Sequence, residues 1–258
     1  MQLNDKVIVI TGASSGIGAL AAQMLSREGA TVVLAARSAD KLQAVGRGMM
    51  GPYHVVEMDV ASDASVAAGF AEIYKRYGRV DVLVNNAGYG KFTALDETPL
   101  QDYSEMMNVN YMGIVRCTKE VLPAMKAAGR GRIVNVASIA GKIGTAKSTA
   151  YTATKHAVIG FSSALRQELS GSGITVSTIN PGPIDTPFFQ IADPDGHYVN
   201  NVKWFMMKPE RVAGAVVKAV RTGKTEMNLP WVAGAGAKLY QLFPAAVGRI
   251  TSGMLNKK

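Results

Sequence analysis

The feature that most restricts the fold is a glycine-containing turn between an apolar run and a helical pattern. Residues 6–10, Lys-Val-Ile-Val-Ile, are rich in β-branched side chains and predict a buried strand. Three glycines follow within eight residues, and residues 16–28 then place apolar side chains at helical spacing. Residues 31–36 predict a second strand. The chain therefore begins with a strand-helix-strand unit.

The same alternation continues along the chain. Further strands are predicted at residues 53–58, 80–84, 132–136, 174–179 and 225–229. Helices are predicted at residues 38–50, 63–77, 99–128, 150–169 and 209–221, the third of them interrupted near Pro123. Mostly apolar strands separated by helices predict an α/β fold, a doubly wound parallel sheet of about seven strands with helices on both faces. No linker or repeat interrupts the pattern, so residues 1–258 are interpreted as one domain.

The glycine turn predicts a phosphate-binding site. Gly12 permits the tight turn, Gly16 lets the backbone approach a pyrophosphate, and Gly18 lets the helix pack closely on the sheet. The N-terminus of the helix supplies free N–H groups and a partial positive charge. The spacing Gly-x3-Gly-x-Gly is less specific than its position between strand and helix, and a turn without a ligand is the alternative.

The end of the second strand indicates which dinucleotide would bind. A carboxylate at this position would bond both ribose hydroxyls of NAD, but the sequence has Ala35-Ala36-Arg37. Arg37 can meet the 2′-phosphate of NADP, and Ser14 and Ser15 add hydroxyls nearby. NADP(H) is therefore the predicted cofactor, and a plain surface role is the alternative for Arg37.

Three polar side chains predict acid/base chemistry. Tyr151 and Lys155 are four residues apart in a helical stretch and so share a face. A phenol has a pKa of about 10 in water, and a nearby ammonium favours its phenolate form. We therefore expect Lys155, with the positive charge of an oxidised nicotinamide, to bring the pKa of Tyr151 down toward neutrality. Ser138 follows a strand, at the sheet edge where ligands bind in open α/β folds.

Five motifs in this order resemble the short-chain dehydrogenase/reductase family, in its compact, single-domain, NADP-preferring form. They are Thr11-Gly12-x3-Gly16-Ile17-Gly18, Asn85-Asn86-Ala87-Gly88, Ser138, Tyr151-x3-Lys155 and Pro181-Gly182-x3-Thr186. The resemblance covers almost the whole chain and implies a Rossmann-like fold. Together the motifs are highly specific, because Ser138 stands thirteen residues before Tyr151.

The resemblance implies a role for each catalytic candidate. Tyr151 would be the general acid/base, Ser138 would polarise the carbonyl, and Lys155 would also bond the nicotinamide ribose. Asn110 matches the family asparagine that bends a helix and holds a proton-relay water, with Asn108 as its rival.

The resemblance also implies the cofactor contacts. Asp59 matches the position that contacts the adenine amine, although a turn or capping aspartate is the alternative. The full implied set is Gly12, Ser14, Ser15, Gly16, Ile17, Gly18, Arg37, Asp59, Val60, Asn86, Ala87, Gly88, Tyr151, Lys155, Pro181, Gly182, Ile184 and Thr186.

Two segments near the C-terminus carry the remaining predictions. Residues 187–207 are rich in aromatic and methionine side chains and predict an apolar substrate lid, which favours a lipophilic substrate. Residues 230–258 form an extension in which Leu239, Phe243, Val247, Ile250 and Met254 recur at helical spacing, with Pro244 breaking the run.

The charge is concentrated at the same end of the chain. The formal net charge is +9, and residues 203–258 contain ten basic but only two acidic side chains. The simpler interpretation is that these charges only form a solvated surface. The more specific interpretation is that they attract an anionic substrate, carrier or membrane. Packing against another subunit is the favoured role of the extension, and membrane contact is less favoured. No basic helix or aromatic-basic motif indicates a nucleic-acid partner.

The predicted function is an NADP(H)-dependent oxidoreductase that moves a hydride between nicotinamide and a carbonyl or alcohol. A 3-oxoacyl-carrier reductase is the nearest alternative, and an NADP-sensing binding protein without turnover is an alternative of another class. The three histidines lack metal-site spacing, so no metal is predicted. The single cysteine, Cys117, suits a reducing compartment and a cytoplasmic location. The family suggests a dimer or tetramer.

Overall fold

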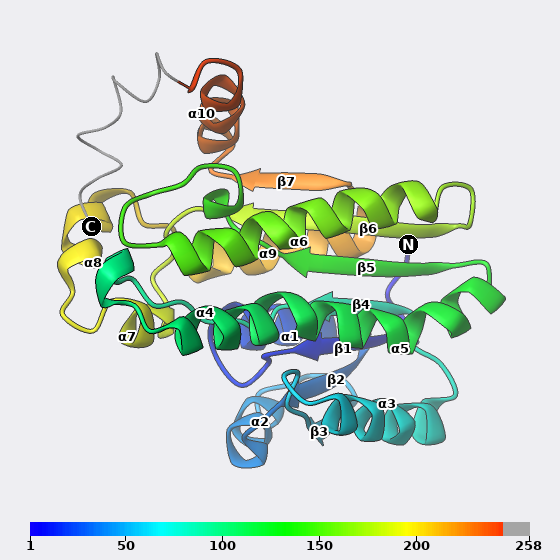
Figure 1. Ribbon diagram of the computed structural model, residues 1–258. Coiled ribbons are helices and arrows are strands. Elements are labelled where there is room, and N and C mark those ends of the chain that lie inside the picture. The colour runs from blue at the N-terminus through cyan, green and yellow to red at the C-terminus, as the bar shows by residue number, and fades with distance from the viewer. Residues whose placement is uncertain (245–258) are drawn as a thin grey trace.

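The computed structural model describes residues 1–244, which are built around one seven-stranded parallel sheet in the order β3-β2-β1-β4-β5-β6-β7 (Figure 1). The strands are β1 (Val7–Thr11), β2 (Thr31–Ala36), β3 (Tyr53–Glu57), β4 (Val82–Asn85), β5 (Gly131–Val136), β6 (Ile174–Pro181) and β7 (Glu226–Leu229). The strand order reverses between the neighbours β1 and β4, as in a doubly wound sheet. The predicted fold class is confirmed.

Helices cover both faces of the sheet, because alternate side chains of each strand are apolar. In β1, Ile8 and Ile10 belong to one core while Val7 and Val9 belong to the other. The first core is covered by α1 (Gly16–Arg27), α2 (Ala39–Gly46) and α9 (Pro209–Thr222). The second face is covered by α3 (Asp63–Tyr77), α4 (Leu100–Met107), α5 (Gly113–Ala127) and α6 (Thr149–Glu168) (Figure 1).

The long helix predicted over residues 99–128 is interrupted at another place than expected. Pro123 lies inside α5, and the break is instead a π-helical turn, η2 (Asn108–Met112), between α4 and α5. The prediction of a break near Pro123 was therefore wrong. Tertiary packing fixes the position of the turn, because a side chain on Gly113 would come within 2.9 Å of Val60. Such π turns are often found at functional sites.

Shorter elements complete the described chain. They are η1 (Leu95–Glu97), η3 (Ile139–Gly141), α7 (Phe188–Ala192), α8 (His197–Val202), η4 (Lys203–Phe205) and α10 (Trp231–Leu242). The lid predicted at residues 187–207 thus consists of short helices, α7, α8 and η4. In the extension, the predicted helical positions Val247, Ile250 and Met254 lie outside the described residues. Within residues 1–244, no helix combines the length and apolarity needed to cross a bilayer.

Candidate active site

The predicted site residues lie at one edge of the sheet because all the strands run parallel. The glycine turn follows β1, Arg37 follows β2, and Asp59 lies beyond β3. Residues 86–88 follow β4, and Ser138 lies beyond the end of β5. The strand arrowheads in Figure 1 point toward the side of the molecule that carries α7 and α8. Residues 187–207, the segment predicted as a lid, therefore stand at the edge where a ligand of this fold binds.

The glycine turn forms a backbone cradle that side chains would fill. Gly12 has φ of 64°, and a Cβ there would lie 2.7 Å from Cα of Ala87. Gly16 has φ of 54°, and a Cβ at this position would meet only Thr186, at 3.8 Å. Ser15 is the N-cap residue of α1, but its side chain makes no capping hydrogen bond. Its hydroxyl is therefore not committed to the helix N-terminus. This cradle at a helix N-terminus fits the pyrophosphate of a dinucleotide.

The loop after β4 supports the cradle through Asn86. Its side-chain amide donates to the carbonyls of Thr11, at 3.0 Å, and Gly12, at 3.1 Å. In return, the Thr11 hydroxyl accepts from the backbone N–H groups of Asn86 and Ala87. Asn86 was predicted as a cofactor contact, which stays a prediction, and its side-chain amide bonds the turn. The supporting role of Thr11 was missed, because it depends on a contact between distant strands.

Tyr151, Ser138 and Lys155 are brought together by α6 and the end of β5. Ser138 lies close enough to Tyr151 to lower the pKa of its phenol, and the Ser138 hydroxyl accepts from the N–H of Ala140 at 3.0 Å. Nζ of Lys155 lies 5.7 Å from the centre of the Tyr151 ring and donates to the Val136 carbonyl at 3.0 Å. The Tyr151 ring thus has the Ser138 side chain and the Lys155 ammonium as neighbours.

Burial determines the protonation of this group. It raises the pKa of Tyr151 to about 12, opposed only in part by Ser138. Burial also lowers the pKa of Lys155 to about 8. Without a cofactor, desolvation of the phenol dominates; the expected fall of the Tyr151 pKa toward neutrality includes the charge of a bound oxidised nicotinamide and stays a prediction for that complex. At neutral pH Tyr151 is a phenol with a proton to donate.

The fully buried Asn110 joins the loop after β4 to α6. Its Oδ1 accepts from the Tyr89 N–H at 2.9 Å, and its Nδ2 donates to the Tyr89 carbonyl and to the Thr154 hydroxyl. A side chain on Gly88 would come within 3.0 Å of Asn110 Oδ1 and 3.7 Å of Lys155 Nζ. The rival Asn108 instead donates to the Ala61 carbonyl. Asn110 is thus the asparagine beside Lys155, and its role in a water relay stays a prediction.

The residues predicted for the adenosine side lie apart from the catalytic group. Arg37 is exposed directly after β2. Asp59 accepts from the N–H of Ala61 through Oδ1, which is the turn contact considered as its alternative. Val60 is buried against Gly113.

The segment after β6 connects Ser138 to the lid. The Ser138 hydroxyl donates to the Pro181 carbonyl at 3.3 Å, and Gly182 N–H donates to the Leu229 carbonyl at 2.7 Å. Ile184 pairs with Met207 in an isolated bridge, which closes the base of the lid.

Aromatic side chains of the lid cover Tyr151. The Phe188 ring lies 5.6 Å from the Tyr151 ring, and Phe92, from the loop after β4, lies 5.9 Å from it. Phe189 and Tyr198 pack on Phe92, and the Phe92 N–H donates to the Ala192 carbonyl. We call Phe92, Phe188, Phe189 and Tyr198 the aromatic lid cluster. Phe92 was missed in the sequence, although an aromatic residue shortly after Asn-Ala-Gly was a usable signal.

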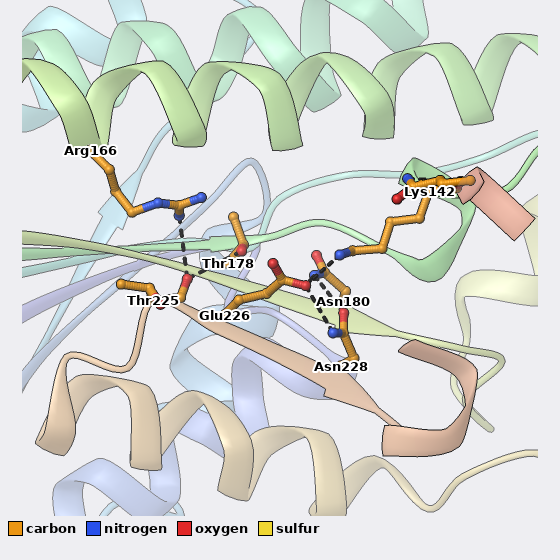
Figure 2. Close-up of polar contacts among 8 residues, drawn as sticks. Lys142, Arg166, Thr178, Asn180, Thr225, Glu226 and Asn228 are labelled. Carbon is orange, nitrogen blue, oxygen red and sulfur yellow. Dashed lines mark hydrogen bonds and ion pairs between the residues drawn. The ribbon is translucent and has the colours of Figure 1, made fainter. Parts of the chain in front are cut away.

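A polar network secures the edge strand behind this site (Figure 2). The Lys142 ammonium, just after η3, pairs with Glu226 of β7. Asn228 donates to Glu226 at 2.8 Å, and Asn180 of β6 donates to Asn228 at 2.9 Å. Because η3 begins directly after Ser138, the network holds β6, β7 and the serine turn together.

A family model described as short chain dehydrogenase matches residues 6–195. The chain belongs to the short-chain dehydrogenase/reductase family. An uncharacterized oxidoreductase of Staphylococcus haemolyticus is 36% identical over 220 residues, which are 85% of this chain and 92% of that protein. A 3-ketodihydrosphingosine reductase of Bacteroides thetaiotaomicron is 38% identical over 186 residues, 72% of this chain and 66% of that protein.

Solved structures of this family superpose closely on the chain. A short-chain dehydrogenase from Streptomyces avermitilis has a TM-score of 0.83 at 28% identity and covers 97% of this chain and 98% of its own. A Burkholderia phymatum family member in complex with NAD has a TM-score of 0.84 at 25% identity. The match covers 93% of this chain and 94% of that chain. A metagenomic family member in complex with NADP has a TM-score of 0.75 at 32% identity. The match covers 88% of this chain and 97% of that chain. The protein is thus an oxidoreductase of a nicotinamide-using family.

Among residues 1–244, no three His, Cys, Asp or Glu side chains are grouped so that they could hold a metal ion. The buried Cys117 has its thiol pKa raised to about 12 by burial, so it is not a reactive thiolate at neutral pH.

Proposed function

We propose that this family member is an NADP(H)-dependent reductase of lipophilic carbonyl compounds. The observation that carries the proposal is the buried Tyr151 ring, which packs against Phe188 and Phe92 and has Ser138 and Lys155 as neighbours. The cofactor would supply a hydride to the carbonyl carbon when bound. The residues of this chain would then have to bind the substrate, orient its oxygen and deliver one proton.

The side chains around Tyr151 are suited to this proton transfer. The Tyr151 hydroxyl would donate to the carbonyl oxygen, and Ser138 would do so by turning its hydroxyl away from the Pro181 carbonyl. Tyr151 would release its proton as the oxygen becomes negative. Lys155, whose pKa is about 8, remains largely an ammonium at neutral pH and stabilises the phenolate that is left. In the reverse direction the phenolate would accept the proton of an alcohol.

The aromatic lid cluster supports a lipophilic substrate. Phe92 and Phe188 pack their rings against Tyr151, and Phe189 packs on both of them, so the side of Tyr151 that they cover is apolar. The Bacteroides relative is named for reducing the keto derivative of dihydrosphingosine, a lipid. A ketone or aldehyde with a large apolar part would bury these rings more completely than a small polar one.

A carbonyl panel tests the proposed activity. Oxidation of NADPH would be followed by its absorbance with aromatic ketones, long-chain ketones, aldehydes and a 3-oxoacyl thioester. We expect turnover on apolar ketones or aldehydes. Preference for the thioester would favour the acyl-carrier alternative. Tight NADPH binding with no turnover on any member would favour the sensing protein.

Arg37 provides the test of cofactor preference. We expect Arg37→Asp to lower the ratio of kcat/KM for NADPH to that for NADH by about tenfold to a hundredfold. That range corresponds to the net free energy that a hydrogen bond to a charged group contributes, about 1.5–3 kcal/mol. Arg47→Asp is the matched control, because Arg47 is also exposed but lies after α2, away from the strand ends. A wild-type preference for NADH would contradict this assignment.

A further inference from the structure

The helix α10 is attached to the sheet by its smallest side chains. Gly234 and Ala237 are its buried residues, and they lie one helical turn apart. A Cβ on Gly234 would come within 2.5 Å of Cβ of Asn228, so the helix approaches β7 as closely as a glycine allows. The inner face of α10 therefore offers little apolar area to the rest of the protein.

The opposite face of the same helix carries the large apolar side chains. Trp231 is 73% exposed, Leu239 51% and Leu242 71%, and their spacing of eight and then three residues places them on one side. Val232 and Phe243, at the two ends, are 53% and 58% exposed. A surface helix normally turns such a stripe toward the core. In α10 the stripe faces outward, which marks an interaction surface.

The charge of this segment indicates what the surface binds. Residues 230–258 contain four basic side chains, Lys238, Arg249, Lys257 and Lys258, and no acidic one. A segment that combines a tryptophan, apolar side chains and basic residues suits the boundary of an anionic bilayer, where apolar groups enter the acyl region and cations meet the headgroups.

A second copy of the chain fits this face less well. Symmetric pairing would place the same patch of both subunits together, so Lys238 of one copy would approach Lys238 of the other. The segment has no carboxylate to offset that repulsion. We propose that the outward face of α10 docks the protein on a membrane surface that contains anionic lipid. The face thus lies on the bilayer, and the proposal does not depend on the reaction catalysed.

Tryptophan fluorescence tests this directly. The chain has two tryptophans, so Trp204→Phe leaves Trp231 as the only reporter. We expect its emission to shift to the blue when phosphatidylcholine vesicles containing phosphatidylglycerol are added. The apparent affinity should be more than about tenfold higher than for phosphatidylcholine alone, and high salt should abolish the difference. Equal binding to both vesicles, or to neither, would overturn the proposal.

Substitutions on the face provide the second test. Val232→Ser, Leu239→Ser and Leu242→Ser combined should reduce vesicle sedimentation more than about tenfold. The matched control is Met50→Ser with Leu100→Ser, which removes two exposed apolar side chains elsewhere. The control should sediment like the wild type. Equal loss in both variants would refute a specific role for α10.

A charge variant keeps the proposal testable if the serine variant does not fold. Lys238→Glu, at an exposed position on α10, should weaken binding to anionic vesicles while leaving thermal unfolding unchanged. Without lipid, Trp231 should be open to quenching at every protein concentration. Protection that disappears on dilution would assign the face to a second copy. Protection independent of concentration would assign it to another segment of the same chain, and both results overturn the proposal.

Discussion

Replacing Tyr151 by phenylalanine is expected to lower kcat by about 10²–10⁴-fold, the usual contribution of a positioned general acid. The substitution removes only the hydroxyl, so the ring can keep its contacts with Phe92 and Phe188. Ser138 would still bind the carbonyl oxygen, but that oxygen could not receive a proton from the phenol. Affinity for NADPH should change by less than about threefold, because no charge and little volume are lost.

Steady-state kinetics and a binding titration separate these two effects. Tyr74→Phe is the matched control, since its hydroxyl donates to the Glu120 carbonyl on the α3–α5 side of the sheet, away from the site. The control should keep its kcat. Retention of more than about a tenth of kcat by Tyr151→Phe would exclude the phenol as the acid. Loss of NADPH binding in that variant would point to a structural role of the hydroxyl instead.

The parts of the fold that sequence could predict are those set by local pattern. The alternation in Val7, Ile8, Val9 and Ile10 requires two apolar faces, and the structure gives each face its own core. The helix over residues 63–77 has its predicted bounds, and in the structure Ser62 caps its start and Gly78 ends it. Such signals lie within a few residues of the feature that they determine.

Features that depend on distant contacts could not be predicted in the same way. The π turn at Asn108–Met112 owes its place to Gly113 against Val60 and to Asn110 bonding the loop at Tyr89. Neither contact has a signature within the helical sequence. Pro123 was the stronger local signal, yet α5 continues through it. Tertiary packing therefore overrides local propensity here.

The same distinction applies to the candidate site. Motif spacing was sufficient to bring Ser138, Tyr151 and Lys155 together, because strand ends and one helix face determine where they lie. The rise in the pKa of Tyr151 in the absence of cofactor could not be predicted from the motif, because it depends on how deeply other side chains bury the ring. That burial comes from Phe92 and Phe188, which belong to segments far apart in the sequence.

The glycine turn gives the second large effect, and a matched pair of substitutions isolates it. Gly12 and Gly78 have nearly the same backbone conformation, with φ of 64° and 68°. A Cβ on Gly78 would meet nothing within 4 Å, whereas a Cβ on Gly12 would lie 2.7 Å from Cα of Ala87. Alanine at either position carries the cost of the left-handed conformation, about 1–2 kcal/mol. Only Gly12→Ala adds a backbone collision.

We therefore expect the free energy of unfolding of Gly12→Ala to be lower than that of Gly78→Ala by about 1–3 kcal/mol, the usual cost of overpacking. Because Asn86 bonds the carbonyl of Gly12, displacement of Ala87 would also move the cradle that is proposed to hold the pyrophosphate. NADPH affinity should fall by more than about tenfold in Gly12→Ala and stay unchanged in Gly78→Ala. Thermal unfolding and NADPH titration measure the two quantities independently. Equal NADPH affinity in both variants would separate the turn from cofactor binding, even if the stability difference were found as expected.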